Sequence, residues 1–374
     1  MKTHQKSVTG EHFSPKKKRY LSLIITERCD LSCIYCYEHS KTSKQMTFEE
    51  AKEIIDKELI HLDEYEYTID FFGGEPFLNF ELIKQVTQYV LENYSGYYHF
   101  SASTNGTQIH GDIQDWLRRH QSVFTACLSA DGTKAAHDIN RSNSFDKIDL
   151  DFFLSLYPQQ TVKMTISEQS LPFLADSIRF LSEKGFLISC NLAYMVDWTS
   201  PKNAQILEEQ LELLMQYYLE NPDTPKCNLM DFQIGILSHP TPDTKKTNKY
   251  CGCGTHMHCY DIKGECYPCQ LFSPLSAAEK SIKSENFNIS QDLLISNFPN
   301  SCQECFYLRI CPFCMGSNYL STGDIYKPDP NRCALYKLIF KANAKLRALE
   351  WEKGHLKTDD EEGVLRSICT IAEL

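Results

Sequence analysis

The feature that most limits what this chain can fold into is the arrangement of its cysteines. The 374 residues include 17 cysteines. Three of them form a Cx3Cx2C triad near the start, Cys29, Cys33 and Cys36, and a second group lies between Cys251 and Cys333. In a large chain without a secretion signal, cysteines grouped this closely favour metal ligation over disulfides. We therefore expect a cytoplasmic metalloprotein.

Charge and hydropathy exclude two classes of partner. The formal net charge of -11 opposes binding to nucleic acid, and the one basic run, Lys16 to Arg19, is short. No apolar stretch approaches the ~20 residues that a membrane span needs. No apolar segment follows the basic run, so the N-terminus does not resemble a secretion signal. We expect neither a nucleic-acid partner nor a membrane partner.

The first two hundred residues alternate strand-like and helix-like segments, which is typical of an α/β fold with a parallel sheet. Thr47 and Glu50 have the spacing of a capping box at the start of the first helix. Six βα units are too few for a closed eight-stranded barrel, so we expect a partial, TIM-like (β/α)6 barrel with its functional groups at the C-terminal strand ends. The expected strands are Leu21–Thr26, Tyr67–Phe72, Tyr98–Ser103, Thr125–Ala130, Thr161–Ile166 and Leu187–Ala193.

The pattern changes after the barrel. A polar linker is expected at 198–203 and a helix at 204–219, after which the cysteine-rich region has no clear periodicity. The end of the chain, around 359–362, is expected to be solvated. We divide the chain into an N-terminal extension at 1–17, the partial barrel at 18–222, a small cysteine-rich iron–sulfur domain at 223–340, and a C-terminal helix and tail at 341–374.

The Cx3Cx2C triad follows the first expected strand directly. Three thiolates can fill three corners of a cubane iron–sulfur cluster and leave the fourth iron without a protein ligand. An iron of this kind can bind a substrate or a cofactor. A zinc site completed by a nearby side chain such as His39 is the alternative.

The triad, with Tyr35 before its third cysteine, resembles the signature of the radical S-adenosylmethionine (SAM) superfamily. The resemblance continues through the Gly-Gly-Glu-Pro motif after the second strand and through polar residues after the third and fourth strands. In that family these positions surround SAM. Arg141 matches an arginine near the SAM carboxylate, although it could equally form a surface ion pair. The implied SAM-binding residues are Tyr35, Gly73, Gly74, Glu75, Pro76, Ser103, Asn105, Ser129, Asp131 and Arg141.

This resemblance implies a reaction. A 4Fe-4S cluster held by Cys29, Cys33 and Cys36 gives an electron to SAM, which is cleaved to methionine and a 5'-deoxyadenosyl radical that abstracts hydrogen from a substrate. The cofactor supplies this chemistry, and the protein positions the reacting atoms and excludes water. The catalytic acid or base stays unknown.

The second cysteine group resembles the SPASM auxiliary-cluster domain, through Tyr-Pro-Cys at 267–269 and the Cx2Cx5C run that begins at Cys302. One departure is that two residues, where relatives have three, separate Cys311 from Cys314. The resemblance implies two further 4Fe-4S clusters, three in all, with Cys266 outside them. A pair of zinc knuckles is the alternative. The implied ligands are Cys251, Cys269, Cys314 and either Cys253 or Cys259 for the near cluster, and Cys302, Cys305, Cys311 and Cys333 for the far one.

Enzymes of this two-part build include maturases of ribosomally made peptides (RiPPs) and anaerobic sulfatase-maturing enzymes. The latter have an aspartate after the Tyr-Pro-Cys, where this chain has Gln270, an amide that cannot act as a base near neutral pH. We therefore favour an oxidoreductase that modifies a precursor peptide. Its expected partners are that peptide and an electron donor such as flavodoxin or ferredoxin. Because Cys29 lies close to residue 1, we expect any recognition of a leader to use another surface of the chain or a separate leader-binding protein. A zinc-stabilised adaptor that binds other proteins is the non-enzymatic alternative.

Overall fold

The computed structural model describes residues 17–194, 196–198, 200–239, 246–247, 251–287 and 293–374. Almost all of the expected N-terminal extension therefore lies outside the described residues. Within the described part, no helix combines the length and the apolar character needed to cross a membrane.

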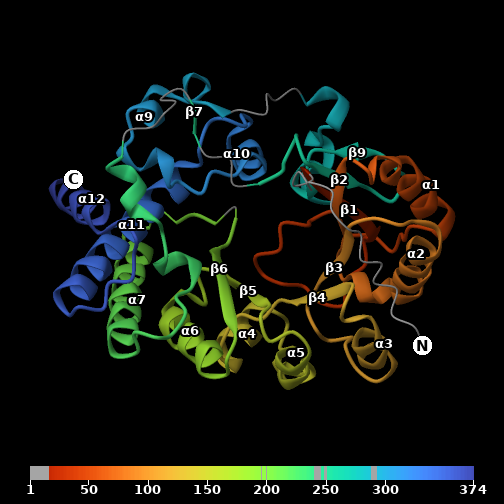
Figure 1. The fold of residues 1–374 in the computed structure, drawn as a ribbon, viewed down its shortest axis with the longest axis horizontal. Coiled ribbons are helices and arrows are strands. Elements are labelled where there is room, and N and C mark those ends of the chain that lie inside the picture. The colour runs from red at the N-terminus through yellow and green to blue at the C-terminus, as the bar shows by residue number, and fades with distance from the viewer. Residues whose placement is uncertain (1–16, 195, 199, 240–245, 248–250, 288–292) are drawn as a thin grey trace, which may run out of the picture.

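Six parallel strands form the first half of the chain, and each matches an expected strand to within a few residues (Figure 1). Successive side chains of a strand point to opposite faces of the sheet, and one face of this sheet is buried against helices. The apolar residues of the strands therefore alternate with more polar ones. The sequence expectation of an α/β partial barrel is confirmed. The strands are β1 (Lys17–Thr26), β2 (Tyr65–Gly73), β3 (Tyr98–Thr104), β4 (Phe124–Leu128), β5 (Thr161–Ile166) and β6 (Leu187–Leu192).

The strands are arranged as an open barrel wall. β1 to β4 pair in chain order within one sheet, and β5 pairs with β6 in a second. A parallel bridge between Ser129 and Lys163 connects the end of β4 to β5. The C-terminal ends of the strands therefore lie along one rim, where functional groups of such folds gather.

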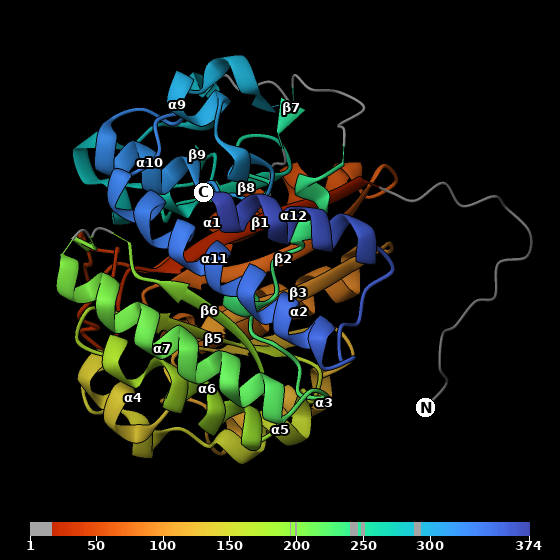
Figure 2. The same cartoon turned by 90° about the vertical axis from the view of Figure 1, so that its left-hand side faces the viewer.

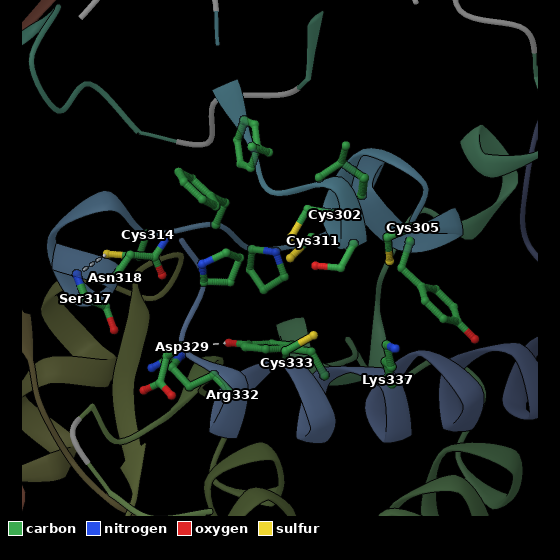
Figure 3. Close-up of a pocket in the computed structure, with 18 of the residues that line it drawn as sticks. Cys302, Cys305, Cys311, Cys314, Ser317, Asn318, Asp329, Arg332, Cys333 and Lys337 are labelled. Carbon is green, nitrogen blue, oxygen red and sulfur yellow. Dashed lines mark hydrogen bonds between the residues drawn. The ribbon is translucent and has the colours of Figure 1, made fainter. Parts of the chain in front are cut away.

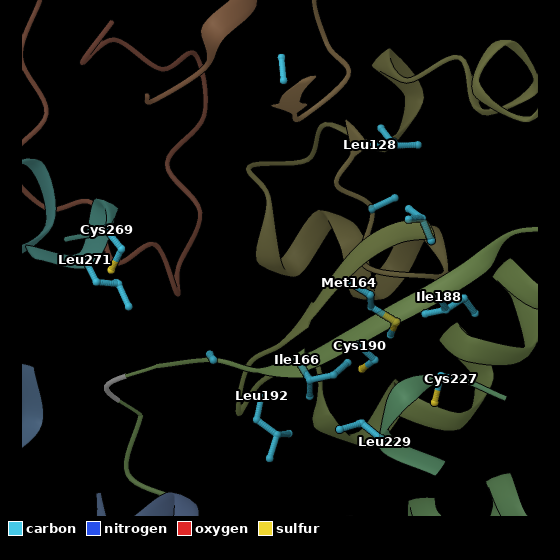
Figure 4. Close-up of a cluster of buried hydrophobic side chains, with 14 of the residues drawn as sticks. Leu128, Met164, Ile166, Ile188, Cys190, Leu192, Cys227, Leu229, Cys269 and Leu271 are labelled. Carbon is cyan, nitrogen blue, oxygen red and sulfur yellow. The ribbon is translucent and has the colours of Figure 1, made fainter. Parts of the chain in front are cut away.

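Helices cover the outer face of the barrel wall. The capping box of Thr47 and Glu50 is present at the start of the first helix, as expected. Figure 4 shows Met164, Ile166, Cys190 and Leu192 on the buried face of β5 and β6. The helices are α1 (Phe48–Glu58), α2 (Phe80–Asn93), α3 (Asp112–His120), α4 (Lys134–Asn140), α5 (Leu150–Leu156), α6 (Leu174–Glu183) and α7 (Pro201–Glu220).

The cysteine-rich region consists of short elements that lie across the top of the molecule in Figure 1. One of them, β8 (Met257–Tyr260), pairs in parallel with β1 and extends the barrel sheet, and β9 (Cys266–Tyr267) pairs with β8. The region and the barrel therefore share one sheet. The other elements are β7 (Lys246–Thr247), α8 (Pro274–Ala277), β10 (Leu293–Leu294), α9 (Asn300–Gln303) and α10 (Met315–Thr322).

After the barrel the expected helix at 204–219 is confirmed within α7, but the expected polar linker at 198–203 was wrong. The expected polar linker contains Trp198, which is 1% exposed and donates its indole N–H to the Ala193 carbonyl, and α7 already begins at Pro201. Residues 359–362 are largely exposed, as expected, and they lead into a helix, α12 (Glu361–Glu373), with Asp360 as its N-cap. Figure 2 shows α7, α11 (Pro330–Glu352) and α12 side by side.

Candidate functional site

The loop that carries the cysteine triad is held against the end of β2 by backbone contacts. The Gly74 and Glu75 amides donate to the Thr26 and Arg28 carbonyls at 3.0 and 2.7 Å. A Cβ at Gly73 would stand 2.0 Å from the Thr26 oxygen, and one at Gly74 would stand 2.2 Å from the Arg28 oxygen. The two glycines thus let β2 approach the segment that leads into Cys29.

Glu75 and Pro76 lie in the interior rather than on an open surface. Glu75 is 1% exposed, and its carboxylate accepts from the Thr104 hydroxyl at 2.8 Å and the Asn105 amide at 2.7 Å. Burial raises the pKa of Glu75 to about 7. Pro76 is also buried, at the start of a short 3-10 turn. Glu75 therefore fixes the turn after β3, and residues of this turn contact the cysteine loop.

Asn105 connects the end of β3 to the cysteine loop. Its side-chain amide donates to Asp30, the residue after Cys29, at 2.8 Å. Thr107 donates to the other Asp30 oxygen at 2.5 Å. Charge-assisted hydrogen bonds of this kind hold the first corner of the triad over the strand ends.

Asp131 connects the other side of the loop to the barrel. This fully buried carboxylate accepts hydrogen bonds from the Tyr35 hydroxyl at 2.7 Å and the Arg141 guanidinium at 2.9 Å, and from the Thr165 amide on β5. The alternative that Arg141 forms a surface ion pair was wrong, because both partners are buried. Asp131 acts as a positioning residue for Tyr35 and Arg141, whose guanidinium lies over the Tyr35 ring.

Ser103 and Ser129 lie further along the inner face of the barrel. The Ser103 hydroxyl accepts from the Lys163 amine at 2.6 Å. Ser129 contributes its backbone to the bridge between β4 and β5. Both serines lie at or just after the C-terminal ends of β3 and β4, below the cysteine loop.

The three thiols of the triad share cationic neighbours. Burial raises the pKa of Cys29 to about 11, and the ammonium of Lys41 acts against this increase. Burial also raises the pKa of Cys33, against the charge of Arg141. The pKa of Lys41 is raised because the charges of Cys36 and Cys29 outweigh the effect of burial. Partly buried thiols with two cations beside them fit an anionic iron–sulfur cluster, which would deprotonate them.

Four cysteines of the second group come together from distant positions. Cys253 and Cys269 share a hydrogen bond that raises the pKa of the first and lowers that of the second. Cys251 and Cys314 interact electrostatically with the same pair. The alternative fourth ligand, Cys259, lies on β8, where its sulfur shares a hydrogen bond with the Ser22 side chain and also interacts electrostatically with Cys269. We call Cys251, Cys253, Cys269 and Cys314 the near set.

A cavity of about 150 Å³ is bordered by four further cysteines, which we call the far set: Cys302, Cys305, Cys311 and Cys333 (Figure 3). Burial and the charges of the other three raise the pKa of Cys311 to about 12. Cys266 is in neither set, and its sulfur contacts the Ser284 hydroxyl at 3.3 Å. Within the part of the chain that the structure describes, no three His, Cys, Asp or Glu side chains are close enough to hold one metal ion.

Sequence reasoning missed an arginine between the near and far sets. Arg332 stacks on the Tyr194 ring at 4.5 Å and donates to the Leu192 carbonyl and the Tyr336 hydroxyl. Among the described residues it has no carboxylate partner within 4.0 Å. A half-buried guanidinium favours a compensating anion nearby, and the neighbouring thiolates would supply one when they hold a cluster. The signal in the sequence that could have identified Arg332 was its position directly before Cys333.

Comparison with known proteins gives a family for the first part of the chain. Residues 23–149 match the model of the radical SAM superfamily. An uncharacterized protein of Methanocaldococcus jannaschii is 31% identical over 170 residues, which are 44% of this chain and 58% of that relative. The radical SAM cyclopropyl synthase TigE of Paramaledivibacter caminithermalis is 23% identical, with 96% of this chain and 80% of TigE aligned. The cysteine-type anaerobic sulfatase-maturating enzyme of Clostridium perfringens is 22% identical over 78% of this chain and 87% of its own.

Solved structures match almost the whole chain. Native anSMEcpe with bound AdoMet and the Kp18Cys peptide superposes with a TM-score of 0.65 at 19% identity, over 91% of this chain and all of that one. Streptococcus suis SuiB bound to its precursor peptide SuiA gives a TM-score of 0.54 at 14% identity, over 84% of this chain and 76% of that one. These matches show that the barrel and the cysteine-rich region together follow a known two-part fold.

Proposed function

We propose that this chain, whose residues 23–149 form a radical SAM domain, modifies a ribosomally made peptide by hydrogen abstraction. The single observation that carries the proposal is the docking of the cysteine loop on the strand ends. Asn105 holds it through Asp30 on one side, and Asp131 holds it through Tyr35 on the other. The loop is thereby fixed above the open interior of the barrel.

We assign Cys29, Cys33 and Cys36 to a 4Fe-4S cluster that binds SAM. When bound, the two together supply a hydrogen-abstracting radical. Arg141, oriented by Asp131, is the cation for the SAM carboxylate. Asp131 and Glu75 are enclosed and fully engaged in hydrogen bonds. Their role in this proposal is to orient the groups that touch SAM.

We assign a second 4Fe-4S cluster to the near set and a third to the far set. The shared hydrogen bond with Cys269 favours Cys253 over Cys259 as the fourth ligand of the near cluster. The Cys259 sulfur instead shares a hydrogen bond with the Ser22 side chain on β1. We propose domain limits at 17/18 and 222/223, whereas the expected limit at 340/341 falls inside α11, which is continuous from Pro330 to Glu352.

The peptide substrate is supported by the comparisons. SuiB is bound to a precursor peptide, anSMEcpe binds the Cp18Cys and Kp18Cys peptides, and TigE is named a cyclopropyl synthase. We infer a cytoplasmic enzyme that receives electrons from a flavodoxin or ferredoxin. A separate protein would recognise the leader of the precursor peptide.

Sulfatase maturation is a second candidate, because the structural match to anSMEcpe is higher than that to SuiB. Gln270 speaks against it. This residue follows Cys269, and its side-chain oxygen is enclosed without a hydrogen-bond partner in the described structure. An amide there can accept a hydrogen bond from a substrate but cannot remove a proton near neutral pH.

The experiment is to co-express the chain with short open reading frames from its own locus and to analyse each peptide by mass spectrometry. The proposal predicts the loss of two hydrogens, roughly 2 Da, from one peptide. The variant with Cys29, Cys33 and Cys36 changed to Ala serves as the control and should leave that peptide unchanged. Conversion of a sulfatase-motif cysteine to formylglycine, unaffected by Gln270→Ala, would instead establish the second candidate.

A further inference from the structure

The inner face of the barrel wall is polar. Phe71, Phe100 and Phe124, on β2, β3 and β4, point outward to the helices. Because side chains alternate along a strand, the residues next to each of them point inward. Parallel pairing places a row of polar inward residues side by side, one from each of four strands. This row consists of Ser22, Asp70, Ser101 and Thr125.

Lys163 projects into this interior from β5. Its neighbours in sequence, Val162 and Met164, are buried on the outer face, so Lys163 lies on the inner one. The amine donates to the Ser103 hydroxyl at 2.6 Å, a contact from β5 to β3 that passes over β4. The side chain is exposed, and among the described residues no carboxylate lies within 4.0 Å of the amine.

Two hydrogen bonds show how far Lys163 lies below the cysteine loop along the barrel axis. Thr165, two residues further along β5, donates its amide to Asp131, which holds Tyr35. Asn105, two residues after Ser103, donates to Asp30. The contact between Lys163 and Ser103 is therefore one inward layer beneath the groups that hold the triad. One layer corresponds to two residues, or roughly 7 Å.

We propose that Lys163 binds a carboxylate of the substrate in the barrel interior, an inference that rests on the proposed function. An ammonium has three donors, and Ser103 takes one of them. A carboxylate is the partner that forms charge-assisted hydrogen bonds with the others. An acidic side chain or a C-terminal carboxylate of the peptide would provide it. Lys163 would then place the neighbouring substrate carbon beneath the SAM site.

The competing role for Lys163 is to neutralise Asp70, in the next layer down. Burial raises the pKa of Asp70, against the charge of Lys163. The Asp70 carboxylate already accepts from Ser101 at 2.6 Å and from Ser22 at 3.4 Å. The Lys163 amine contacts Ser103 instead. A purely neutralising lysine would become dispensable once Asp70 is changed to Asn.

The test uses the full-length enzyme and the peptide that the co-expression experiment identifies. Lys163→Met should raise the KM for the peptide by roughly tenfold or more and leave peptide-free formation of 5'-deoxyadenosine unchanged. Lys163→Arg should restore most of the affinity. Lys184→Met, at the exposed end of α6, is the matched control and should change neither quantity.

Matched peptides identify the carboxylate. Changing one Glu or Asp of the peptide to its amide, or amidating its C-terminus, should reproduce the KM increase with wild-type enzyme and add nothing with Lys163→Met. If every amide peptide behaves like the parent, the proposal is wrong. It is equally wrong if Lys163→Met lowers peptide-free 5'-deoxyadenosine formation to the same extent, or if adding Asp70→Asn restores the KM.

A probe pair separates this proposal from the peptide assignment. N-acetylglutamate α-amide and N-acetylglutamine α-amide are titrated into SAM-loaded enzyme and followed by saturation-transfer NMR. Preferential binding of the glutamate probe that disappears in Lys163→Met supports a carboxylate site even when no peptide is modified. Equal binding of the two probes would contradict it.

Discussion

Replacing Gly73 by alanine should displace the cysteine loop while the rest of the fold persists. Gly73 ends β2 with a φ of +141°, and an added Cβ would stand 2.0 Å from the Thr26 carbonyl oxygen. Ordinary contact between carbon and oxygen is roughly 3.3 Å, so the two backbones must separate by roughly 1.3 Å. That oxygen also accepts the Gly74 amide at 3.0 Å, and Cys29 follows three residues later.

Gly323→Ala is a matched control for backbone strain. Gly323 has a φ of +77°, and an added Cβ would meet no heavy atom within 4 Å. Gly323→Ala costs about 1–2 kcal/mol because an L-residue adopts a left-handed conformation, and Gly73→Ala adds a strain of its own because its φ lies outside that region. Only Gly73→Ala also moves the strand end that leads to the triad. The difference between the two variants therefore measures the backbone contact together with the strain that alanine meets at the φ of Gly73.

The assay is anaerobic iron analysis together with formation of 5'-deoxyadenosine. Gly73→Ala should lose about four irons per chain, the content of one cubane cluster. A misplacement of ~1 Å can reduce a rate by about a hundredfold, and we expect at least that loss of 5'-deoxyadenosine. Gly323→Ala should retain both. Full iron and full activity in a correctly folded Gly73→Ala enzyme would refute the role given to this contact.

Substitutions at three further positions test ionisable groups of the site and the core. Asp131→Ala should lower the free energy of urea unfolding by about 3–5 kcal/mol, because it leaves Arg141 buried without its partner, and Asp131→Asn should cost less. Burial lowers the pKa of His137 to about 4, so the wild type should lose on the order of 3 kcal/mol of stability as the pH falls from 6.5 to 4. His137→Gln should flatten that part of the stability profile; a profile identical to wild type would exclude His137 as the cause. Arg332→Met should shift an auxiliary-cluster midpoint potential to more negative values in an EPR titration, Arg332→Lys should shift it less, and an unchanged potential would contradict the compensating role of Arg332.

The barrel strands were predictable because each strand carries its own signal. In β5 the buried residues Val162, Met164 and Ile166 alternate with more exposed ones, and the observed bounds equal the expected ones. The capping box before α1 is equally local, since it spans four residues. Local patterns of this kind survive in the fold because the same face is buried along the whole element.

The elements that were missed depend on distant partners. β8 is a four-residue strand among cysteines, and it forms because β1 offers it a free edge. His258, which a loop assignment would leave in solvent, pairs there with Glu58 at 2.8 Å. Trp198 stands in a polar segment but fills a buried position. None of these partners is visible within a short window of sequence.

The candidate site was predictable in its chemistry but not in its connections. The cysteine spacing and the Gly-Gly-Glu-Pro motif predicted the superfamily whose model matches residues 23–149. The hydrogen bond from Tyr35 to Asp131 joins residues 96 apart in the sequence, and that from Asn105 to Asp30 joins residues 75 apart. Arg332 and Lys163 carry no motif. Their significance follows only from which charges the fold leaves without a partner.

The most direct test of the central claim, that three cysteine sets hold iron–sulfur clusters and the first one binds SAM, is iron and acid-labile sulfide analysis with EPR. Anaerobically prepared wild-type protein should contain about twelve irons and about as many sulfides per chain. Changing Cys29, Cys33 and Cys36 together to Ala should leave about eight irons and abolish the change that SAM causes in the EPR spectrum of the reduced enzyme. Zinc without labile sulfide, or continued reductive cleavage of SAM by the triple variant, would contradict the account.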